Sequence, residues 1–332
     1  MLRASLRTSL RVLAALVAVA VVLVAVVTVV RDGRDDPDAD DPGQRRAVAE
    51  GRARVAPRLP GEVLTTIGVV SYNALRHLPL ERARRDWDRL TGRDDVDLIG
   101  WQESKSPAFR ELYPQYRARG WETWHWPDPD GPISLAVSWR TATFELLDVS
   151  FRRMHRGGFP RETTDPFPAR WVVTAQLRHR ATGRTVTLLN THVNQHIETG
   201  QRFERNLNAE RAKQHLARLA RMWDTAPGSV VLGTGDYNFD FADDARARPA
   251  GGITRAFRGR ASSTYQLLGL DGLRPTRNTR WIDYVFVADR SLRTAGAAAG
   301  SRSGTAQIAR HRVLGGYASD HAPLLARIRV YR

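Results

Sequence analysis

Side chains that bind metals or move protons recur beside the short apolar runs of this sequence. Asparagine, glutamate, aspartate and histidine stand at or next to the ends of six such runs. In chain order they are Asn73, Glu103, His192 with Asn194, Asp236 with Asn238, Asp283, and Asp320 with His321. One polar residue after a strand is ordinary turn chemistry. Repetition in six segments is not explained by turns, and loops at strand ends are where a rigid scaffold collects catalytic groups.

The absence of cysteine narrows what these residues can do. With no cysteine in 332 residues, a thiolate nucleophile, a thiolate metal site and a disulfide framework are all excluded. Any metal must therefore be held by oxygen or imidazole ligands, and hard cations such as Mg²⁺ or Mn²⁺ prefer oxygen. Hydrolysis of a phosphate ester suits such a set, because a metal offsets charge on the phosphoryl oxygens while a nearby base activates water.

The elements that must position these residues are mostly short β-strands. Apolar, β-branched runs predict strands at Thr65–Ser71, Asp97–Ile99, Ile133–Trp139, Phe144–Val149, Trp171–Leu177, Val186–Asn190, Val230–Gly233, Ile282–Val287 and Leu324–Val330. Apolar residues at helical spacing predict helices at Leu80–Leu90 and Gln201–Trp223. Many strands with few helices between them favour layered sheets covered by helices over a doubly wound parallel sheet.

The ordered set of motifs resembles the endonuclease/exonuclease/phosphatase superfamily, whose members have a DNase-I-like fold. The motifs are Asn73, WQE ending at Glu103, THVN with His192, GDYN with Asp236, IDYV with Asp283, SDHAP with His321, and the Pro275–Thr276 pair before IDYV. Each motif alone is weakly specific, but the full order covers the chain from about residue 64 to its end. The resemblance implies an α/β fold, a four-layer α/β/β/α sandwich of two mixed sheets with the active site at one rim.

The resemblance also implies which residues bind the metal and the substrate. Glu103 would bind Mg²⁺ or Mn²⁺ with help from Asn73, and Asp320 would hold the same metal or a second one. Asn194 and Arg170 would bind substrate, with capping and surface positions as the alternative. One metal or two, and the group that protonates the leaving oxygen, stay open at this point.

The remaining matched residues would carry the chemical step. Asp236 would orient and deprotonate the attacking water, and Asn238 would position the phosphate or the metal's water. Asp283 would fix the tautomer of His321 and raise its basicity, so that the imidazolium contacts the phosphoryl oxygens. His192 would stabilise the pentacovalent transition state.

The first 60 residues differ in character from the rest. Residues 1–11 are basic, residues 12–30 are apolar apart from Thr28, and residues 31–60 are charged and rich in proline, glycine and aspartate. An apolar run of this length spans roughly 28 Å as a helix, which predicts a transmembrane signal anchor. The arginines before it predict a cytoplasmic N-terminus, so a flexible linker would lead to an extracytoplasmic catalytic domain at residues 61–332. The alternative is secretion after cleavage, although no clear cleavage motif follows the run.

The sequence indicates the substrate less clearly than the type of reaction. A net charge of +16 favours a polyanion such as nucleic acid, although the arginine excess also fits a bias in composition. The arginines near residues 152–161 and 246–280 either bind a polyanion or are part of the solvated surface. The aromatic residues at 121–126 either stack on bases or pack in the core. The motifs typical of inositol-polyphosphate phosphatases are missing. We therefore expect a nuclease-like phosphodiesterase without an obligate protein partner, the alternatives being a sphingomyelinase-like lipid phosphodiesterase and a catalytically inactive binding module on the same fold.

Overall fold

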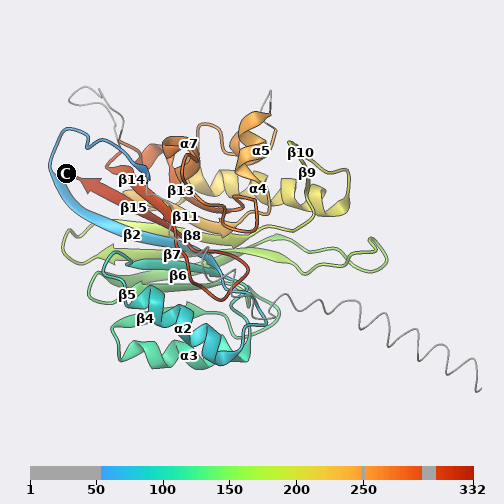
Figure 1. The fold of residues 1–332 in the computed structure, drawn as a ribbon, viewed down its shortest axis with the longest axis horizontal. Helices are drawn as coiled ribbons and strands as arrows, with labels where there is room; N and C mark the ends of the chain where they lie inside the picture. Colours follow the sequence, from blue (N-terminus) through green and yellow to red (C-terminus); the bar gives the residue numbers. More distant parts are fainter. Residues whose placement is uncertain (1–53, 248–250, 294–303) are drawn as a thin grey trace, which may run out of the picture. The chain divides into compact units, whose positions relative to one another are not determined.

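The first of the two large β-sheets contains most of the strands in the N-terminal half of the domain together with its last two strands (Figure 1). The computed structural model describes residues 54–247, 251–293 and 304–332. The seven strands of this sheet are, in spatial order, β1 (Arg54–Val55), β14 (Ala306–Val313), β15 (Leu324–Tyr331), β2 (Val63–Asn73), β3 (Leu98–Gln102), β5 (Ala136–Arg140) and β4 (Trp121–His125). It is a mixed sheet, because β2 and β3 are parallel and the other neighbours are antiparallel.

The second sheet has six strands and is also mixed. In spatial order they are β12 (Ala261–Ser263), β13 (Asp283–Ala288), β11 (Val230–Asp236), β8 (Thr185–His192), β7 (Arg170–His179) and β6 (Phe144–His155). The parallel pair is β8 and β11. Every residue of β11 is buried, as expected for a central strand covered on both faces.

Helices cover the outer faces of the two sheets. They are α2 (Leu80–Thr91), α3 (Pro107–Arg117), α4 (Leu207–Thr225), α5 (Phe241–Arg246), α6 (Ile253–Ala256) and α7 (Thr264–Leu268), with a 3₁₀ turn, η2, at Asp289–Ser291. Figure 1 shows α2 and α3 on one side of the sheets and α4 on the other. Trp87 of α2 stacks on Trp101 of β3 with ring centroids 4.4 Å apart, and Trp223 of α4 packs on Phe286 of β13.

The inner faces of the sheets meet through a buried polar contact as well as apolar packing. Asn190 of β8 is fully buried, and its Nδ2 donates to the carbonyl oxygens of Trp101 (2.9 Å) and Ala136 (3.0 Å) in the opposite sheet. Its Oδ1 accepts from Gln102 Nε2 at 2.7 Å and from Thr234 Oγ1 at 3.0 Å. The predicted arrangement of two mixed sheets with helices is therefore confirmed.

The predicted start of the long helix was wrong. The helix begins at Leu207 rather than at Gln201, because Glu198–Thr199 (β9) and Arg202–Phe203 (β10) form a small hairpin before it. Asn206 then caps the helix by accepting from the backbone N–H of Ala209 at 2.8 Å.

Other predicted boundaries also shift. The strand expected from Ile133 begins at Ala136, because Pro132 and Leu135 form a turn first. The strands β4 and β14 and the helix α3 were not expected; α3 contains Pro114, a residue that normally interrupts a helix.

The N-terminal edge of the domain lies earlier than expected. The predicted linker extended to residue 60, but β1 pairs with β14, and Gln307 Nε2 donates to the carbonyl of Pro57 at 2.7 Å. Arg54–Val55 therefore belongs to the sheet, and the residues from 56 to 60 remain hydrogen-bonded to the domain. The predicted membrane span at residues 12–30 lies outside the described residues, and within those residues no helix is long and apolar enough to cross a membrane.

Candidate active site

The strand directions bring the predicted catalytic residues to one edge of the two sheets. β2 and β3 are parallel, as are β8 and β11, so the carboxyl ends of each pair lie together. β13 and β15 are antiparallel to β11 and β2, so their amino ends reach the same edge. The residues placed there are Asn73, Glu103, His192, Asp236, Asp283 and His321.

Asp236 lies at the centre of this cluster and is 1% exposed. Its Oδ2 accepts from Asn73 Nδ2 at 3.0 Å, and its Oδ1 accepts from the backbone N–H of Asn238 at 2.9 Å. Burial raises the pKa of Asp236 to about 6, with His321 opposing and Asp283 adding to the effect. The carboxylate is thus mostly ionised at neutral pH and basic enough to accept a proton from water.

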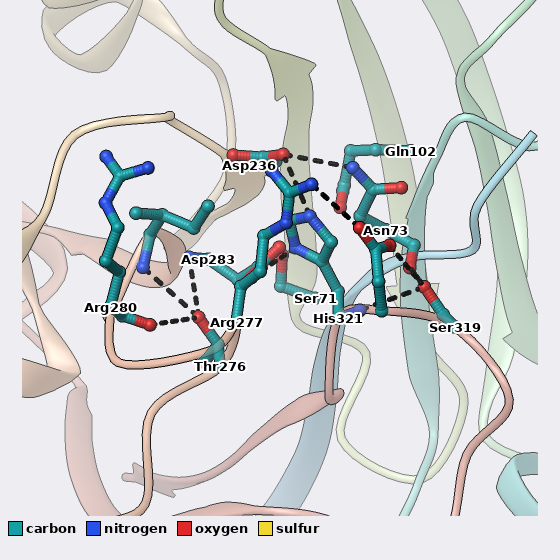
Figure 2. Close-up of polar contacts among 12 residues, drawn as sticks. Ser71, Asn73, Gln102, Asp236, Thr276, Arg277, Arg280, Asp283, Ser319 and His321 are labelled. Atoms are coloured by element: carbon teal, nitrogen blue, oxygen red, sulfur yellow. Dashed lines mark hydrogen bonds and ion pairs between the residues drawn. The ribbon is translucent and has the colours of Figure 1, made fainter. Parts of the chain in front are cut away.

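His321 and Asp283 form a buried pair beside Asp236 (Figure 2). Asp283 Oδ2 lies 2.8 Å from His321 Nδ1, and His321 Nε2 lies 3.8 Å from Asp236 Oδ2. Burial alone would lower the pKa of His321, but the carboxylates of Asp283, Asp236 and Asp320 together outweigh it, Asp283 most of all, and raise the pKa to about 9. The imidazole is therefore a cation at neutral pH, with Nε2 directed toward Asp236.

Two hydroxyl groups hold the backbone of this pair. Ser319 Oγ accepts from the backbone N–H of His321 at 3.1 Å and donates to the carbonyl of Asn73 at 2.7 Å. Figure 2 shows Thr276 on the other side, where its Oγ1 accepts from the N–H of Asp283 at 3.2 Å. The Thr276 turn and the loop before β15 thus carry the pair together.

His192 and Asn238 form the other side of the cluster. His192 Nε2 lies 3.4 Å from Asp236 Oδ2 and 3.2 Å from Asn238 Nδ2, which also donates to the carbonyl of Val193 at 3.1 Å. Burial, followed by Arg170 and His321, lowers the pKa of His192 well below its usual value. His192 is therefore neutral, and its contacts with Asp236 and Asn238 are hydrogen-bonding contacts rather than contacts of a cation. Asn238 has φ +51°, a left-handed conformation that asparagine tolerates better than most residues.

The predicted metal ligands line a small cavity at this edge. It has a volume of about 170 Å³ and is lined by residues that include Asn73, Glu103, Asp236, Asp320 and His321. Glu103 directly follows β3 with φ +57°, and its Oε2 accepts from the backbone N–H of Arg76 at 3.2 Å. Carboxylate and amide oxygens facing a solvent-connected cavity fit a hard divalent cation.

Asp320 and the buried carboxylates are less suited to hold a metal as they stand. Asp320 Oδ2 forms an ion pair with Arg277 Nη2 at 2.8 Å. Asp236, Asp283 and His321 also offer ligand atoms close together, but His321 Nδ1 is already bonded to Asp283. Glu103 and Asn73 could hold a metal at this cavity, and the metal roles predicted for Glu103, Asn73 and Asp320 stay predictions.

A second cavity of about 260 Å³ adjoins the first, sharing the lining residues Arg76, Glu103, His192 and Gln195. Arg170 also lines it, and its Nε donates to Asn194 Oδ1 at 3.0 Å. The two predicted substrate-binding residues thus interact: Asn194, fully buried, orients the guanidinium that faces the cavity.

Cationic side chains dominate the second cavity. Arg76, Lys105 and Arg170 line it, and none of the three forms an ion pair with a carboxylate of the described residues. A larger cavity of about 610 Å³ lies between α4 and α6, and its lining includes none of the predicted site residues.

The structure also shows where the arginines near residue 152 and the aromatic residues at 121–126 lie. Arg152 and Arg153, expected in a loop, lie on β6, which is longer than predicted. Trp121 is buried on β4, and the Trp126 ring packs on Phe151 with centroids 4.6 Å apart, so core packing describes these aromatics better than base stacking.

Several residues at the site were not singled out from the sequence. Arg76 and Lys105 lie within three residues of Asn73 and Glu103, and this proximity was the available signal. Arg277 and Arg280 lie between the Pro275–Thr276 pair and Asp283, but nothing in the sequence indicates that they pair with Asp320 and Glu198.

Comparison with known proteins identifies the fold. No protein-family model and no curated protein matches the sequence. Among solved structures, D. rerio TDP2 complexed with a single-strand DNA product aligns at TM-score 0.57 and 16% identity, covering 80% of this chain and 100% of the other. An endonuclease/exonuclease/phosphatase family protein from Bacteroides thetaiotaomicron aligns at TM-score 0.55 and 18% identity over 81% and 98%. ANGEL2, a 2′,3′-cyclic phosphatase, aligns at TM-score 0.54 and 15% identity over 86% and 99%. The expected endonuclease/exonuclease/phosphatase fold is confirmed, and at these identities the likeness concerns the fold.

Proposed function

We propose that the protein is a divalent-metal-dependent hydrolase that cleaves phosphate esters of nucleic acid. One observation supports this above all: a buried, hydrogen-bonded Asp236 lies between the neutral His192 and the His321–Asp283 pair, in a cavity that also exposes Glu103. A base, a cation and a candidate metal ligand thus face one small volume. A binding module has no need of this combination, which disfavours the catalytically inactive alternative.

The residues divide the reaction between them. Asp236 orients a water molecule and takes its proton, while Asn73 and the N–H of Asn238 hold the carboxylate in place. His321, kept protonated by Asp283, donates from Nε2 to the phosphoryl oxygens as negative charge builds up. His192 contributes a hydrogen bond to the same transition state.

Glu103 and Asn73 would hold Mg²⁺ or Mn²⁺. Such a cation supplies charge neutralisation on the phosphoryl oxygens and the leaving oxygen. The protein contributes oxygen ligands at a fixed strand edge, with the Arg76 N–H orienting the Glu103 carboxylate.

The second cavity supports nucleic acid over sphingomyelin. Next to the reacting phosphate, sphingomyelin carries a cationic choline group, whereas a nucleic acid carries another phosphate. Arg76, Lys105 and Arg170 line this cavity with two carboxylates, Glu103 and Asp165, of which Glu103 is assigned to the metal. The excess positive charge repels choline and attracts a second phosphate. TDP2, which shares the fold, is complexed with a single-strand DNA product, and this agrees with a nucleic-acid substrate here.

We further propose that residues 12–30 anchor the protein in a membrane and that the catalytic domain lies on the extracytoplasmic side. The support is the apolar run itself, with arginines before it and aspartates after it. Protease added to intact cells should then remove the catalytic domain. A domain that stays protected until the cells are lysed would contradict this orientation.

The test of function is a substrate panel with the full-length chain purified in detergent. Metal is stripped with EDTA and restored by titration with Mg²⁺ or Mn²⁺ against single-stranded DNA, duplex DNA, RNA, sphingomyelin and inositol phosphates. We expect metal-dependent cleavage of nucleic acid that weakens steeply between about 50 and 200 mM salt. Cleavage of sphingomyelin alone would show that the substrate is wrong, and no cleavage of any ester would favour the inactive module.

A further inference from the structure

Glu198, on the small hairpin after His192, connects two loops that belong to other parts of the site. Both of its carboxylate oxygens lie 3.0 Å from the backbone N–H of Asp240, two residues after Asn238. The carboxylate also forms an ion pair with Arg280, three residues before Asp283. The Glu198 side chain is 9% exposed and the Arg280 side chain is 37% exposed, so the carboxylate is shielded from solvent while the guanidinium is partly exposed.

Each partner of Glu198 is tied directly to residues of the site. Arg280 Nη2 also donates to the carbonyl of Asn238 at 3.3 Å, so the ion pair bonds to the backbone that carries Asp236 and Asn238. The carbonyl of Arg280 accepts from the N–H of Thr276 at 3.0 Å, within the turn that holds Asp283 in Figure 2.

The same turn is bonded to the loop that carries His321. The carbonyl of Thr276 accepts from the N–H of Ala322, the residue after His321, at 2.7 Å. Asp240 completes the connection from the other side, because its Oδ1 accepts from the N–H of Trp281 at 3.0 Å.

We propose that Glu198 and Arg280 are positioning residues that set the separation between the Asp236–Asn238 loop and the Asp283–His321 pair. This inference rests on the proposed function. Asp236 Oδ2 and His321 Nε2 must face one phosphate, yet they lie on different segments of the chain, and their separation is 3.8 Å. A misplacement of about 1 Å between catalytic groups can cost about 100-fold in rate.

Replacing Glu198 by glutamine removes the charge and little else. The side-chain carbonyl oxygen of the new glutamine can still accept from the N–H of Asp240, and Arg280 is exposed enough to be solvated, so the domain should fold. Burial raises the pKa of Glu198 to about 7, although Arg280 and the N–H of Asp240 act in the opposite direction. Glutamine imitates the protonated form of the Glu198 carboxyl group.

The test is steady-state kinetics of the full-length chain at saturating metal, with hydrogen exchange of residues 236–241 and 276–283. We expect Glu198→Gln to lower kcat about 10- to 100-fold with little change in KM, and to speed exchange in both segments. Arg280→Gln should do the same. The double variant should lose no more than either single variant, because the two residues act as one unit.

Asp97→Asn is the matched control. Asp97 is also a buried carboxylate that accepts from a backbone N–H, that of Gly68 at 2.8 Å, but it lies at the opposite end of β3 from Glu103. We expect it to lower the thermal midpoint without a comparable loss of kcat.

Three results would overturn the positioning role: near-wild-type kcat in Glu198→Gln, losses in Asp97→Asn equal to those in Glu198→Gln, or multiplied losses in the double variant. If the wild-type chain hydrolyses no ester, the proposed function fails instead. The rates of hydrogen exchange in residues 236–241 and 276–283 then test the positioning role by themselves. Unchanged exchange in Glu198→Gln would reject that role.

Discussion

Replacing Asp283 by asparagine tests the electrostatics of the site, because it changes one charge and almost no volume. His321 Nδ1 lies 2.8 Å from Asp283 Oδ2, and the His321 side chain is 3% exposed. A pKa raised from 6.5 to about 9 corresponds to about 3 kcal/mol in favour of the imidazolium. Burial lowers the pKa of an imidazole, and only Asp236 and Asp320 would still oppose it in this variant, so we expect the pKa of His321 to fall back toward 6.5 once Asp283 is neutralised.

The assay is an NMR titration of the histidines in metal-free protein, with urea unfolding at several pH values. A folded pKa above the unfolded one stabilises the protein fully below pH 6.5, and this contribution disappears as the pH rises through about 9. The difference in unfolding free energy between wild type and Asp283→Asn should therefore be largest below pH 6.5 and shrink by about 3 kcal/mol beyond pH 9. In activity assays the alkaline limb of the pH–rate profile should move to lower pH.

Asp320→Asn is the control for this experiment. Asp320 also raises the pKa of His321, but less than Asp283 and Asp236 do, so its removal should shift the titration only slightly. A wild-type His321 that titrates near 6.5, or a titration that Asp283→Asn leaves unchanged, would show that Asp283 does not keep the imidazole protonated.

Four further changes probe the base, the metal, the substrate and the sheet interface. Asp236→Asn should lower kcat by about 10² to 10⁴ at saturating metal, with circular dichroism confirming the fold; near-wild-type kcat would reject Asp236 as the base. Glu103→Gln should instead raise the Mg²⁺ or Mn²⁺ concentration needed for half-maximal activity, measured by metal titration. Arg170→Ala should weaken nucleic-acid binding and reduce the dependence of log K on log salt by about one phosphate contact, measured by fluorescence anisotropy; an unchanged slope would contradict that contact. Gly100→Ala would place a Cβ 1.9 Å from Thr234 Oγ1 between the sheets, so the unfolding free energy in urea should fall by about 1–3 kcal/mol.

The buried strands could be predicted well because their signal is local. The predicted strand Thr65–Ser71 lies within β2, which spans Val63–Asn73, and the predicted strand Val230–Gly233 lies within β11. A central strand is apolar on both faces, so its residues identify it without knowledge of its neighbours. The same runs located Asn73 and Asp236 at their ends, which is why the candidate residues converge in the structure.

The missed elements have weaker local signals. The strand β14 reads AQIARHRV, with charged residues among the apolar ones, and it depends on pairing with β15 and β1. The helix α3 has Pro114 inside it, yet Phe109, Leu112 and Tyr116 bury one face against the core formed with α2. In both cases tertiary packing overrides what the residues alone would indicate.

The contacts that orient the catalytic groups are the least predictable, because each joins distant segments. Arg277 pairs with Asp320, and Arg170 with Asn194, after the chain has crossed between strands. Glu198 and Arg280 are 82 residues apart, and neither belongs to a motif that names a function. Sequence motifs identify the groups that react, because only a few residue types can perform a given chemical step. Residues that set the distance between such groups can be of any suitable shape and charge, so only the folded chain identifies them, and the kinetics of Glu198→Gln will measure how much the reaction depends on them.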